Sequence, residues 1–398
     1  MRILFVLPYV PSLIRVRPYN FIRSLARRHE ITVLATSMAG EAEDVAALQA
    51  ICEGVHIVPF RLATGLRSCA RAALCGEPLQ AAVCRSPAAE RLLRDLLARG
   101  RFDVVHVEHL RAAYLGAHIP RDLPTVFDSV DSISLLLERT LQSSHSLRQR
   151  LQAALELHRT RRYEAGILRR FHQVAVTSPD DAAALQALAP DGRVTVVPNG
   201  VDLEYFRPPA GPRDAATLVF SGKMSYHANA TAVLHFVRHI LPIVRRSRPD
   251  VRVKIVGSRP PAPIRALTAD PAITVTGHVP DIREAIAPCT VAICPVTVKV
   301  GIQNKVLEAM ALGVPVVSTR AGLGGLAAEP GRDILVADDE TTFAGQVCRL
   351  LDDPQLCRQL GMAGRHYVED HHRWDTAADR LEGLYRQARS EVLAGIRA

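Results

Sequence analysis

Lys305 and Glu308 are the two charged residues of the stretch GIQNKVLEAMALG, residues 301–313. Residues three apart share one face of a helix, so both side chains can reach one ligand. A lysine can hold a phosphate as a point charge, and a carboxylate can accept hydrogen bonds from the vicinal hydroxyls of a ribose. A helix that is apolar nearly all round is buried, and a buried charge needs a partner. We therefore favour a ligand site over the alternative, a Lys–Glu salt bridge on a wet surface.

The residues before this helix add a place for an anion. Gly301 allows close approach of the backbone, and the free N–H groups at the start of a helix attract negative charge. Residues 301–304 follow an apolar run at 290–296 and open a helix that is expected to reach about Leu312. The sequence thus predicts phosphate binding at this helix N-terminus, with Lys305 one turn inside it.

Lysine is rare in this chain, which makes each lysine informative. Of the 49 basic residues four are lysines, and residues 1–200 contain none. An arginine- and alanine-rich bias of this kind gives little weight to any single surface arginine. The four lysines are Lys223, Lys254, Lys299 and Lys305.

The elements that must position these residues alternate along the whole chain. Short, β-branched, apolar runs are separated by helical stretches, which is typical of βαβ units and of parallel sheets covered on both faces. In the first half these runs lie at 2–7, 30–36, 54–60, 102–108, 123–128, 173–178 and 193–198. In the second half they lie at 216–222, 251–257, 272–277, 290–296, 314–319 and 333–338. The sequence predicts an α/β protein with two doubly wound domains.

The domain boundary is expected in VPNGVDLEYFRPPAGPRD, residues 197–214, which is rich in Pro, Gly and Asn and has no hydrophobic period. The predicted organisation is a Rossmann-like acceptor-binding domain at 1–198, a linker at 199–214, and a Rossmann-like nucleotide-sugar domain at 215–375. A C-terminal helix at 376–398 could return to the first domain.

Composition narrows the class of protein. With 48% hydrophobic and 22% charged residues, the chain reads as an ordinary globular protein. Its first apolar run, Ile3 to Leu7, is too short for the core of a signal peptide, and no run approaches the roughly 20 apolar residues of a spanning helix. The eight cysteines show no metal-binding spacing, and the net charge of +9 comes without a dense basic run interleaved with aromatics. We expect a cytoplasmic chain with free thiols that does not bind nucleic acid.

One basic segment leaves two interpretations open. Residues 133–171 carry eight arginines and three glutamates on a helical pattern. A solvated helical face is the favoured interpretation. The other is a peripheral contact with an anionic membrane, at the inner face of the plasma membrane.

The ordered set NKVLEAMALGVPVVST, GRDILVAD, VVPNGVD and FSGKMSYHAN resembles the retaining glycosyltransferases of family 4, and the similarity runs over nearly the whole chain. Within that family, the sequence most resembles the sugar transferases of bacterial exopolysaccharide gene clusters. The resemblance implies a GT-B fold, in which two Rossmann-like doubly wound domains face each other across a cleft. It implies sugar transfer from a nucleotide-diphosphate-sugar to a hydroxyl of a glycan, lipid-linked glycan or small molecule, with retention and with no metal or cofactor.

The resemblance also assigns the donor side. Glu308 falls on the second Glu of the family's Glu-x7-Glu motif, which holds the ribose. Gly222-Lys223 falls on the family's Gly-Arg pair, so Lys223 and Lys305 would stabilise the departing diphosphate as catalytic residues. The implied donor-binding residues are Gly222, Lys223, His278, Val279, Gly301, Ile302, Gln303, Asn304, Lys305 and Glu308.

Three departures leave the sugar and acceptor side open. Val300 stands at the first Glu of Glu-x7-Glu, Asp128 stands at the catalytic-site His, and PSLIRVRPYN replaces the glycine loop after the first strand. Asp128 is the catalytic candidate here, and the other candidates are Arg15, Arg17, His106, Glu108, His109 and Asp131. As alternatives, Asp128 or Asp131 could cap a helix beginning near Ile133, and the two arginines could be ordinary surface residues. HVEH, residues 106–109, has no third ligand at metal spacing, so no metal is expected.

Two other functions remain as alternatives. Val300 and Asp128 would fit a nucleotide-sugar-binding protein with a degenerate site, and a GT-B nucleotide-sugar epimerase would use the same donor. GLGGLA, residues 322–327, mimics a dinucleotide fingerprint, but no ribose-binding acid follows a second strand about 20 residues on. The base and sugar of the donor, and the acceptor, are not fixed by the sequence.

Overall fold

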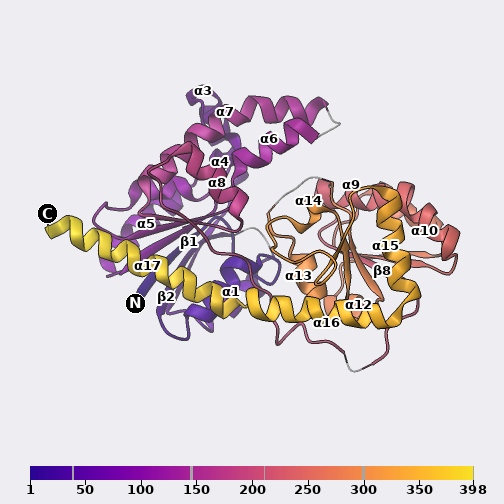
Figure 1. Cartoon of the computed structure of the whole chain (residues 1–398). Coiled ribbons are helices and arrows are strands. Elements are labelled where there is room, and N and C mark those ends of the chain that lie inside the picture. The colour runs from indigo at the N-terminus through magenta and orange to yellow at the C-terminus, as the bar shows by residue number, and fades with distance from the viewer. Residues whose placement is uncertain (38–39, 144–146, 210, 298–300, 398) are drawn as a thin grey trace. The chain divides into compact units, whose positions relative to one another are not determined.

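The computed structural model describes all residues except 38–39, 144–146, 210, 298–300 and 398. The chain forms two compact units (Figure 1). The first comprises Met1–Pro198 and Trp374–Ala398, and the second comprises Asn199–Arg373. Residues 199–214, expected as a linker, therefore belong to the second unit.

The first unit is a parallel seven-stranded sheet in the order β3-β2-β1-β4-β5-β6-β7. The strand order reverses between β1 and β4, and these two strands pair with each other in parallel. The strands are β1 Arg2–Leu7, β2 Glu30–Ser37, β3 Gly54–Pro59, β4 Val104–Glu108, β5 Thr125–Val130, β6 Gln173–Val176 and β7 Val194–Val196.

Helices cover both faces of this sheet because its central strands are apolar on both sides. Leu4 and Val6 of β1 enter one core, while Ile3, Phe5 and Leu7 enter another on the opposite face. The first unit contains α1 Val16–Leu25, α2 Ala42–Gln49, α3 Leu62–Cys75, α4 Leu79–Ala82, α5 Pro87–Arg99, η1 Ala113–His118, α6 Ile133–Ser143, α7 Leu147–Arg170, α8 Pro179–Leu188 and α17 Trp374–Arg397. Helix α5 starts with a capped turn, in which Ser86 Oγ accepts from the Ala89 N–H ahead of Pro87.

The last helix, α17, is part of the first unit. Trp374, Leu381, Leu384 and Tyr385 are buried in the same core as α1, and the Phe21 and Trp374 rings meet edge to face at 5.5 Å. These apolar anchors explain why the end of the chain packs on the first sheet.

The second unit is a parallel six-stranded sheet in the order β10-β9-β8-β11-β12-β13, with its reversal between β8 and β11. Its strands are β8 Thr217–Ser221, β9 Arg252–Val256, β10 Ile273–Gly277, β11 Val291–Cys294, β12 Val316–Ser318 and β13 Leu335–Val336. Its helices are α9 His227–His235, η2 Phe236–Ile240, α10 Leu241–Ser247, α11 Ala262–Arg265, η3 Ala266–Ala269, α12 Ile282–Ile286, α13 Asn304–Ala311, α14 Arg320–Leu323, α15 Glu340–Asp352 and α16 Pro354–His371.

The predicted fold class, an α/β protein with two doubly wound parallel sheets, is confirmed. The late strands are shorter than expected: the run at 314–319 gives Val316–Ser318, and the run at 333–338 gives Leu335–Val336. Pro315 explains one boundary, because proline has no N–H to donate to a sheet. Among the described residues, no helix is long and apolar enough to cross a membrane.

Candidate active site

The loops at the carboxyl ends of β8 and β11 flank the point where the second sheet reverses its strand order. Ligands of doubly wound sheets bind at this position. Gly222 and Lys223 follow β8, and α13 with Lys305 and Glu308 follows β11. The topology therefore brings the expected donor residues of these two segments to one edge of one sheet.

Lys305 is held by two neighbours from the β8 side. Its Nζ donates to Asn229 Oδ1 at 2.5 Å and lies 4.4 Å from the centre of the Phe220 ring. Burial lowers the pKa of Lys305, and the nearby Cys294 and Glu308 oppose that shift. The ammonium group is thus fixed in position before any ligand arrives.

Glycine is required where the β8 and β9 loops meet. A Cβ on Gly222, whose φ is +145°, would lie 2.8 Å from Asn229 Nδ2. A Cβ on Gly257, whose φ is +151°, would lie 1.8 Å from the Gly222 carbonyl oxygen. Asn229 Nδ2 also donates to the Lys223 carbonyl at 3.0 Å. One buried amide therefore organises both the Lys223 loop and the Lys305 ammonium group, while the side chain of Lys223 is exposed.

Glu308 does not pair with Lys305. Within the described part of the chain, no ion pair or hydrogen bond engages its carboxyl group, which is partly exposed. Burial raises the pKa of Glu308 to about 7, against the lowering effect of Lys305. The alternative of a Lys–Glu surface salt bridge is therefore wrong, and the carboxyl group has no protein partner among these residues.

The start of α13 is the expected phosphate-binding position. The helix begins at Asn304, and the side chain of Gln303 does not cap it. Asn304 Oδ1 accepts from Asn199 Nδ2 at 3.1 Å, so the PNG turn supports the first residue of the helix. Gly301 and Ile302 lie ahead of α13 and are partly buried. Val300 lies outside the described residues.

His278 and Val279 lie on the turn after β10, two strands away from β8. His278 is exposed and Val279 is partly buried. The Gly257 N–H donates to the Gly277 carbonyl at 3.1 Å, so this turn is joined to the loop that contacts Gly222. The expected base-binding turn thus belongs to the same edge of the second sheet.

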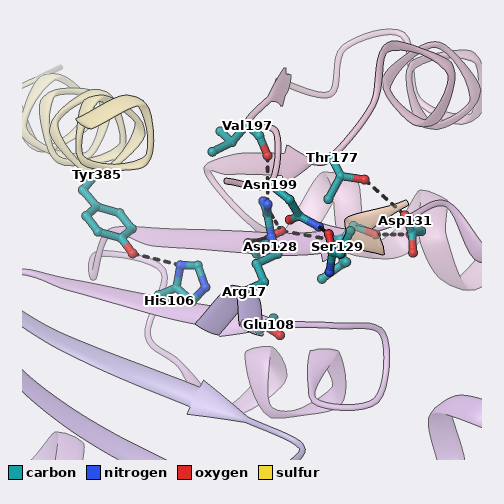
Figure 2. Close-up of polar contacts among 12 residues, drawn as sticks. Arg17, His106, Glu108, Asp128, Ser129, Asp131, Thr177, Val197, Asn199 and Tyr385 are labelled. Atoms are coloured by element: carbon teal, nitrogen blue, oxygen red, sulfur yellow. Dashed lines mark hydrogen bonds and ion pairs between the residues drawn. The ribbon is translucent and has the colours of Figure 1, made fainter. Parts of the chain in front are cut away.

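A buried ion pair marks the carboxyl edge of the first sheet (Figure 2). Arg17 Nε donates to Asp128 Oδ2 at 2.7 Å, and its Nη2 donates to Oδ1 at 3.1 Å. Arg17 is 4% exposed and Asp128 is 0% exposed. The Nη1 group donates to the Val197 carbonyl at 2.9 Å. The alternative of a surface Arg17 is therefore wrong, and Asp128 does not face solvent.

Asp128 and Asp131 do not cap the helix that begins at Ile133. Glu164 of α7 does so, because its Oε1 accepts from the Ile133 N–H at 2.7 Å. Asp131 Oδ1 instead accepts from Thr177 Oγ1 at 3.2 Å (Figure 2), and burial raises the pKa of Asp131 to about 6. The capping alternative fails because the capping carboxylate comes from a distant helix.

His106 and Glu108 lie beside this ion pair on β4. Tyr9 donates to Glu108 Oε1 at 2.6 Å, and Tyr385 of α17 contacts His106 Nδ1 at 3.0 Å. Burial raises the pKa of Glu108 to about 8, helped by the charge of Asp128. Burial lowers the pKa of His106 to about 4. At neutral pH we therefore expect a protonated Glu108 and a neutral His106.

His106, Glu108 and Asp128 each offer one ligand atom within 4.8 Å of the others. The stretch HVEH lacked a third metal ligand at metal spacing in the sequence. Asp128 comes close to it in the fold, because it lies opposite Glu108 on the neighbouring strand. However, both oxygens of Asp128 accept from Arg17. The guanidinium group already supplies the charge of a cation, so these residues fit a metal ion poorly.

The remaining candidates line the loops of the first sheet. Arg15 donates to Glu41 Oε1 at 2.7 Å and lies over the Tyr9 ring at 4.8 Å. His109 has a φ of 68°, and burial lowers its pKa to about 4. Val130 has a φ of 67° at a bulge next to Asp128. Positive φ is unfavourable for a β-branched residue, and such strain gathers at functional sites.

Sequence reasoning missed three residues of these two edges: Tyr9, Asn229 and Tyr385. Tyr9 could have been found, because it follows the first strand directly and the loops after parallel strands form sites. Asn229 and Tyr385 lie inside helices, and their partners are 76 and 279 residues away. No local pattern distinguishes them.

Replacing Glu108 by Gln is expected to change how stability depends on pH. The folded pKa of about 8 lies above the ordinary value of 4.5, so folding favours the protonated form. The contribution of Glu108 is fully present below pH 4.5 and is lost as the pH rises to about 8, by up to about 1.4 kcal/mol per pH unit. Urea unfolding of both proteins across this window should show that the free energy of unfolding of Glu108→Gln rises relative to that of the wild type as the pH rises. A stability difference between the two proteins that stays constant across this window would contradict the buried acid.

Comparisons with known proteins match this fold and its two units. The family model described as Glycosyltransferase Family 4 matches residues 15–205, and the model described as Glycosyl transferases group 1 matches residues 215–353. The MMP α-(1→4)-mannosyltransferase of Mycolicibacterium hassiacum is 30% identical over 235 residues, 56% of this chain and 54% of that protein. The D-inositol 3-phosphate glycosyltransferase 1 of Catenulispora acidiphila is 28% identical over 322 residues, 74% of each chain. The chain spans about half the length of most curated relatives that it matches.

Solved structures share the fold over nearly the whole chain. Sucrose-phosphate synthase from Thermosynechococcus elongatus has a TM-score of 0.75 at 17% identity and covers 98% of this chain and 100% of its own. HepE of Anabaena, solved with UDP, has a TM-score of 0.67 at 15% identity and covers 96% and 99%. Two doubly wound parallel sheets with these neighbours define a protein of the GT-B class. Within that class, the chain belongs to family 4 of the glycosyltransferases.

Proposed function

We propose that this protein is a hexosyl- or other glycosyltransferase that moves a sugar from a nucleotide-diphosphate-sugar to a hydroxyl acceptor, with retention of configuration. The observation that carries the proposal is the edge of the second sheet, where Lys305 is fixed by Asn229 beside the unpartnered carboxyl group of Glu308. A fixed cation and a free acid at the strand-order reversal suit a diphosphate and a ribose.

In the proposed reaction, the bond between the sugar C1 and the diphosphate oxygen breaks, and a bond from C1 to the acceptor oxygen forms. The acceptor proton leaves to the departing diphosphate. Negative charge develops on that diphosphate, so Lys305, Lys223 and the N-terminus of α13 stabilise the transition state more than the ground state. Gly222 lets the backbone approach the phosphates, and Glu308 accepts from the ribose hydroxyls.

The first sheet would serve the sugar and the acceptor. Both oxygens of Asp128 are taken by Arg17, so we propose that Asp128 positions Arg17 instead of facing the sugar as the catalytic group. Tyr9, Arg15 and His109 lie nearer the exposed loops of this edge and are the candidates for acceptor contact.

The names of relatives support two donor bases and a lipid-like acceptor. Three relatives carry names of GDP-mannose-dependent mannosyltransferases acting on phosphatidylinositol mannosides, and HepE was solved with UDP-glucose. For this chain we propose a glycan or lipid-linked glycan acceptor, in polysaccharide or glycoconjugate synthesis. The eight free cysteines support a reducing, cytoplasmic site of action.

The test is a thermal-shift screen of the full chain against UDP-, GDP-, ADP- and dTDP-sugars, because a ligand that binds the native state raises the melting temperature. We expect one donor to raise it, and Glu308→Gln to need roughly ten times more of that donor, since a hydrogen bond to a charged group is lost. Glu284→Gln, on α12 of the same unit, is the control and should leave the donor response unchanged.

Three outcomes would separate this function from its alternatives. Nucleotide release with a sugar acceptor, unchanged by EDTA, supports metal-independent transfer. Conversion of the donor sugar without an acceptor indicates an epimerase. Donor binding without nucleotide release, with any of a panel of glycan acceptors, indicates a degenerate binding protein.

A further inference from the structure

Two helices of the first unit expose leucines to solvent. Of the thirteen large hydrophobic residues that are exposed in the described part of the chain, six lie on α3 and α7. Exposed apolar side chains that gather into one patch mark an interaction site. They are Leu62 at 65%, Leu66 at 63% and Leu74 at 90% on α3, and Leu147 at 81%, Leu151 at 63% and Leu155 at 64% on α7.

The leucines of each helix follow a helical period. Leu147, Leu151 and Leu155 are four residues apart, so they form one stripe along α7. The two helices meet near the C-terminal end of α3, where Arg159 of α7 donates to the Ala73 carbonyl of α3 at 3.5 Å. Leu74 and Leu155 therefore both lie within one helical turn of this link. We call the exposed leucines of α3 and α7 the leucine surface.

Positive charge accompanies the leucine surface, and negative charge does not. Helix α3 contains no acidic residue. The two acids of α7 point elsewhere: Glu156 binds the Leu79 N–H at 2.8 Å, and Glu164 caps α6. Among the described residues, the following exposed arginines of α3 and α7 make no ion pair: Arg67, Arg71, Arg148, Arg150 and Arg162.

We propose that the leucine surface docks on an anionic lipid bilayer. Leucines would enter the boundary between headgroups and acyl chains, while the arginines stay at the phosphate level. The charge argues against a second copy of this chain on the same face, because two such faces would repel each other. The inference does not depend on the proposed sugar transfer.

This proposal differs from the membrane contact through the basic segment 133–171 that the sequence left open. The leucines of α6 are partly buried, so the stretch 133–143 contributes little. The surface comes from α7 together with α3, whose residues are far away in sequence. The docking surface is thus made by the fold and not by one amphipathic segment.

The test is co-sedimentation of the full chain with phosphatidylcholine vesicles, with and without phosphatidylglycerol. We expect binding that requires phosphatidylglycerol and weakens with salt. The triple variant Leu74→Gln/Leu151→Gln/Leu155→Gln should bind at least about tenfold more weakly, because three apolar side chains no longer enter the bilayer. Arg148→Gln and Arg150→Gln should each weaken binding by roughly fivefold.

Leu393→Gln provides the matched control, since Leu393 is 55% exposed on α17 of the same unit. It should bind vesicles like the wild type. An unchanged melting temperature of the triple variant shows that it is folded. Three results would overturn the proposal: no binding of the wild type to phosphatidylglycerol vesicles at low salt, equal binding of the triple variant, or a dimer in light scattering that the same three substitutions abolish.

Discussion

Lys305→Ala is expected to lower turnover by roughly 10²- to 10³-fold, the loss that follows removal of one fixed donor to a developing charge. The ammonium group is held by Asn229 and Phe220 before substrate binds, so it stabilises the leaving diphosphate without reorganising. Nucleotide release in a coupled assay measures the effect. The variant should still fold, because its main cost is the Asn229 Oδ1 left without a donor, about 1–3 kcal/mol, and no buried charge loses an ion-pair partner.

Lys254→Ala is the control for this prediction. Lys254 lies on β9 of the same unit, outside the carboxyl-edge loops, and its loss should leave turnover within a few-fold of the wild type. Turnover of Lys305→Ala that matches the control would remove the leaving-group role from Lys305.

Arg17→Ala is expected to destabilise the protein by about 3–5 kcal/mol, because it leaves the Asp128 carboxylate buried without its partner. Urea unfolding measures the change. The proposed positioning role adds a second readout, since turnover of the surviving folded fraction should also fall.

The pair Arg2–Glu30 gives the matched control, because both side chains are more than half exposed in the same unit. Arg2→Ala should change stability by less than about 1 kcal/mol. The double variant Arg17→Met/Asp128→Leu should recover much of the lost stability, since neither charge remains. If Arg17→Ala were no worse than Arg2→Ala, the ion pair would not be a buried structural element.

The fold could be predicted because its signal is local. Near-continuous apolar strands alternating with helices indicated two doubly wound sheets, and the second of these places Lys305 and Glu308 on a helix after a central strand as expected. The early strands matched their apolar runs within a few residues. Several strands are shorter than their predicted runs, among them β7, β11, β12 and β13. Pro315 explains one of these boundaries, because proline has no N–H to donate to a sheet.

The contacts of the site could not be predicted, because they join distant parts of the chain. Arg17 and Asp128 are 111 residues apart, and Lys305 and Asn229 are 76 residues apart. The local sequence around Arg17 reads like any surface arginine, and burial alone reveals its role. The leucines of α3 posed the opposite problem, since an apolar helical stripe predicts burial and the structure exposes it.

Hydrogen–deuterium exchange of the full chain, with and without UDP-glucose or GDP-mannose, tests the donor site most directly. Slower exchange is predicted in the loop after β8, residues 222–229, and across the start of α13, residues 301–308, with one of the two donors. Protection confined to other segments, or none with either donor at concentrations that raise the melting temperature, would contradict a nucleotide-sugar site at this edge of the second sheet.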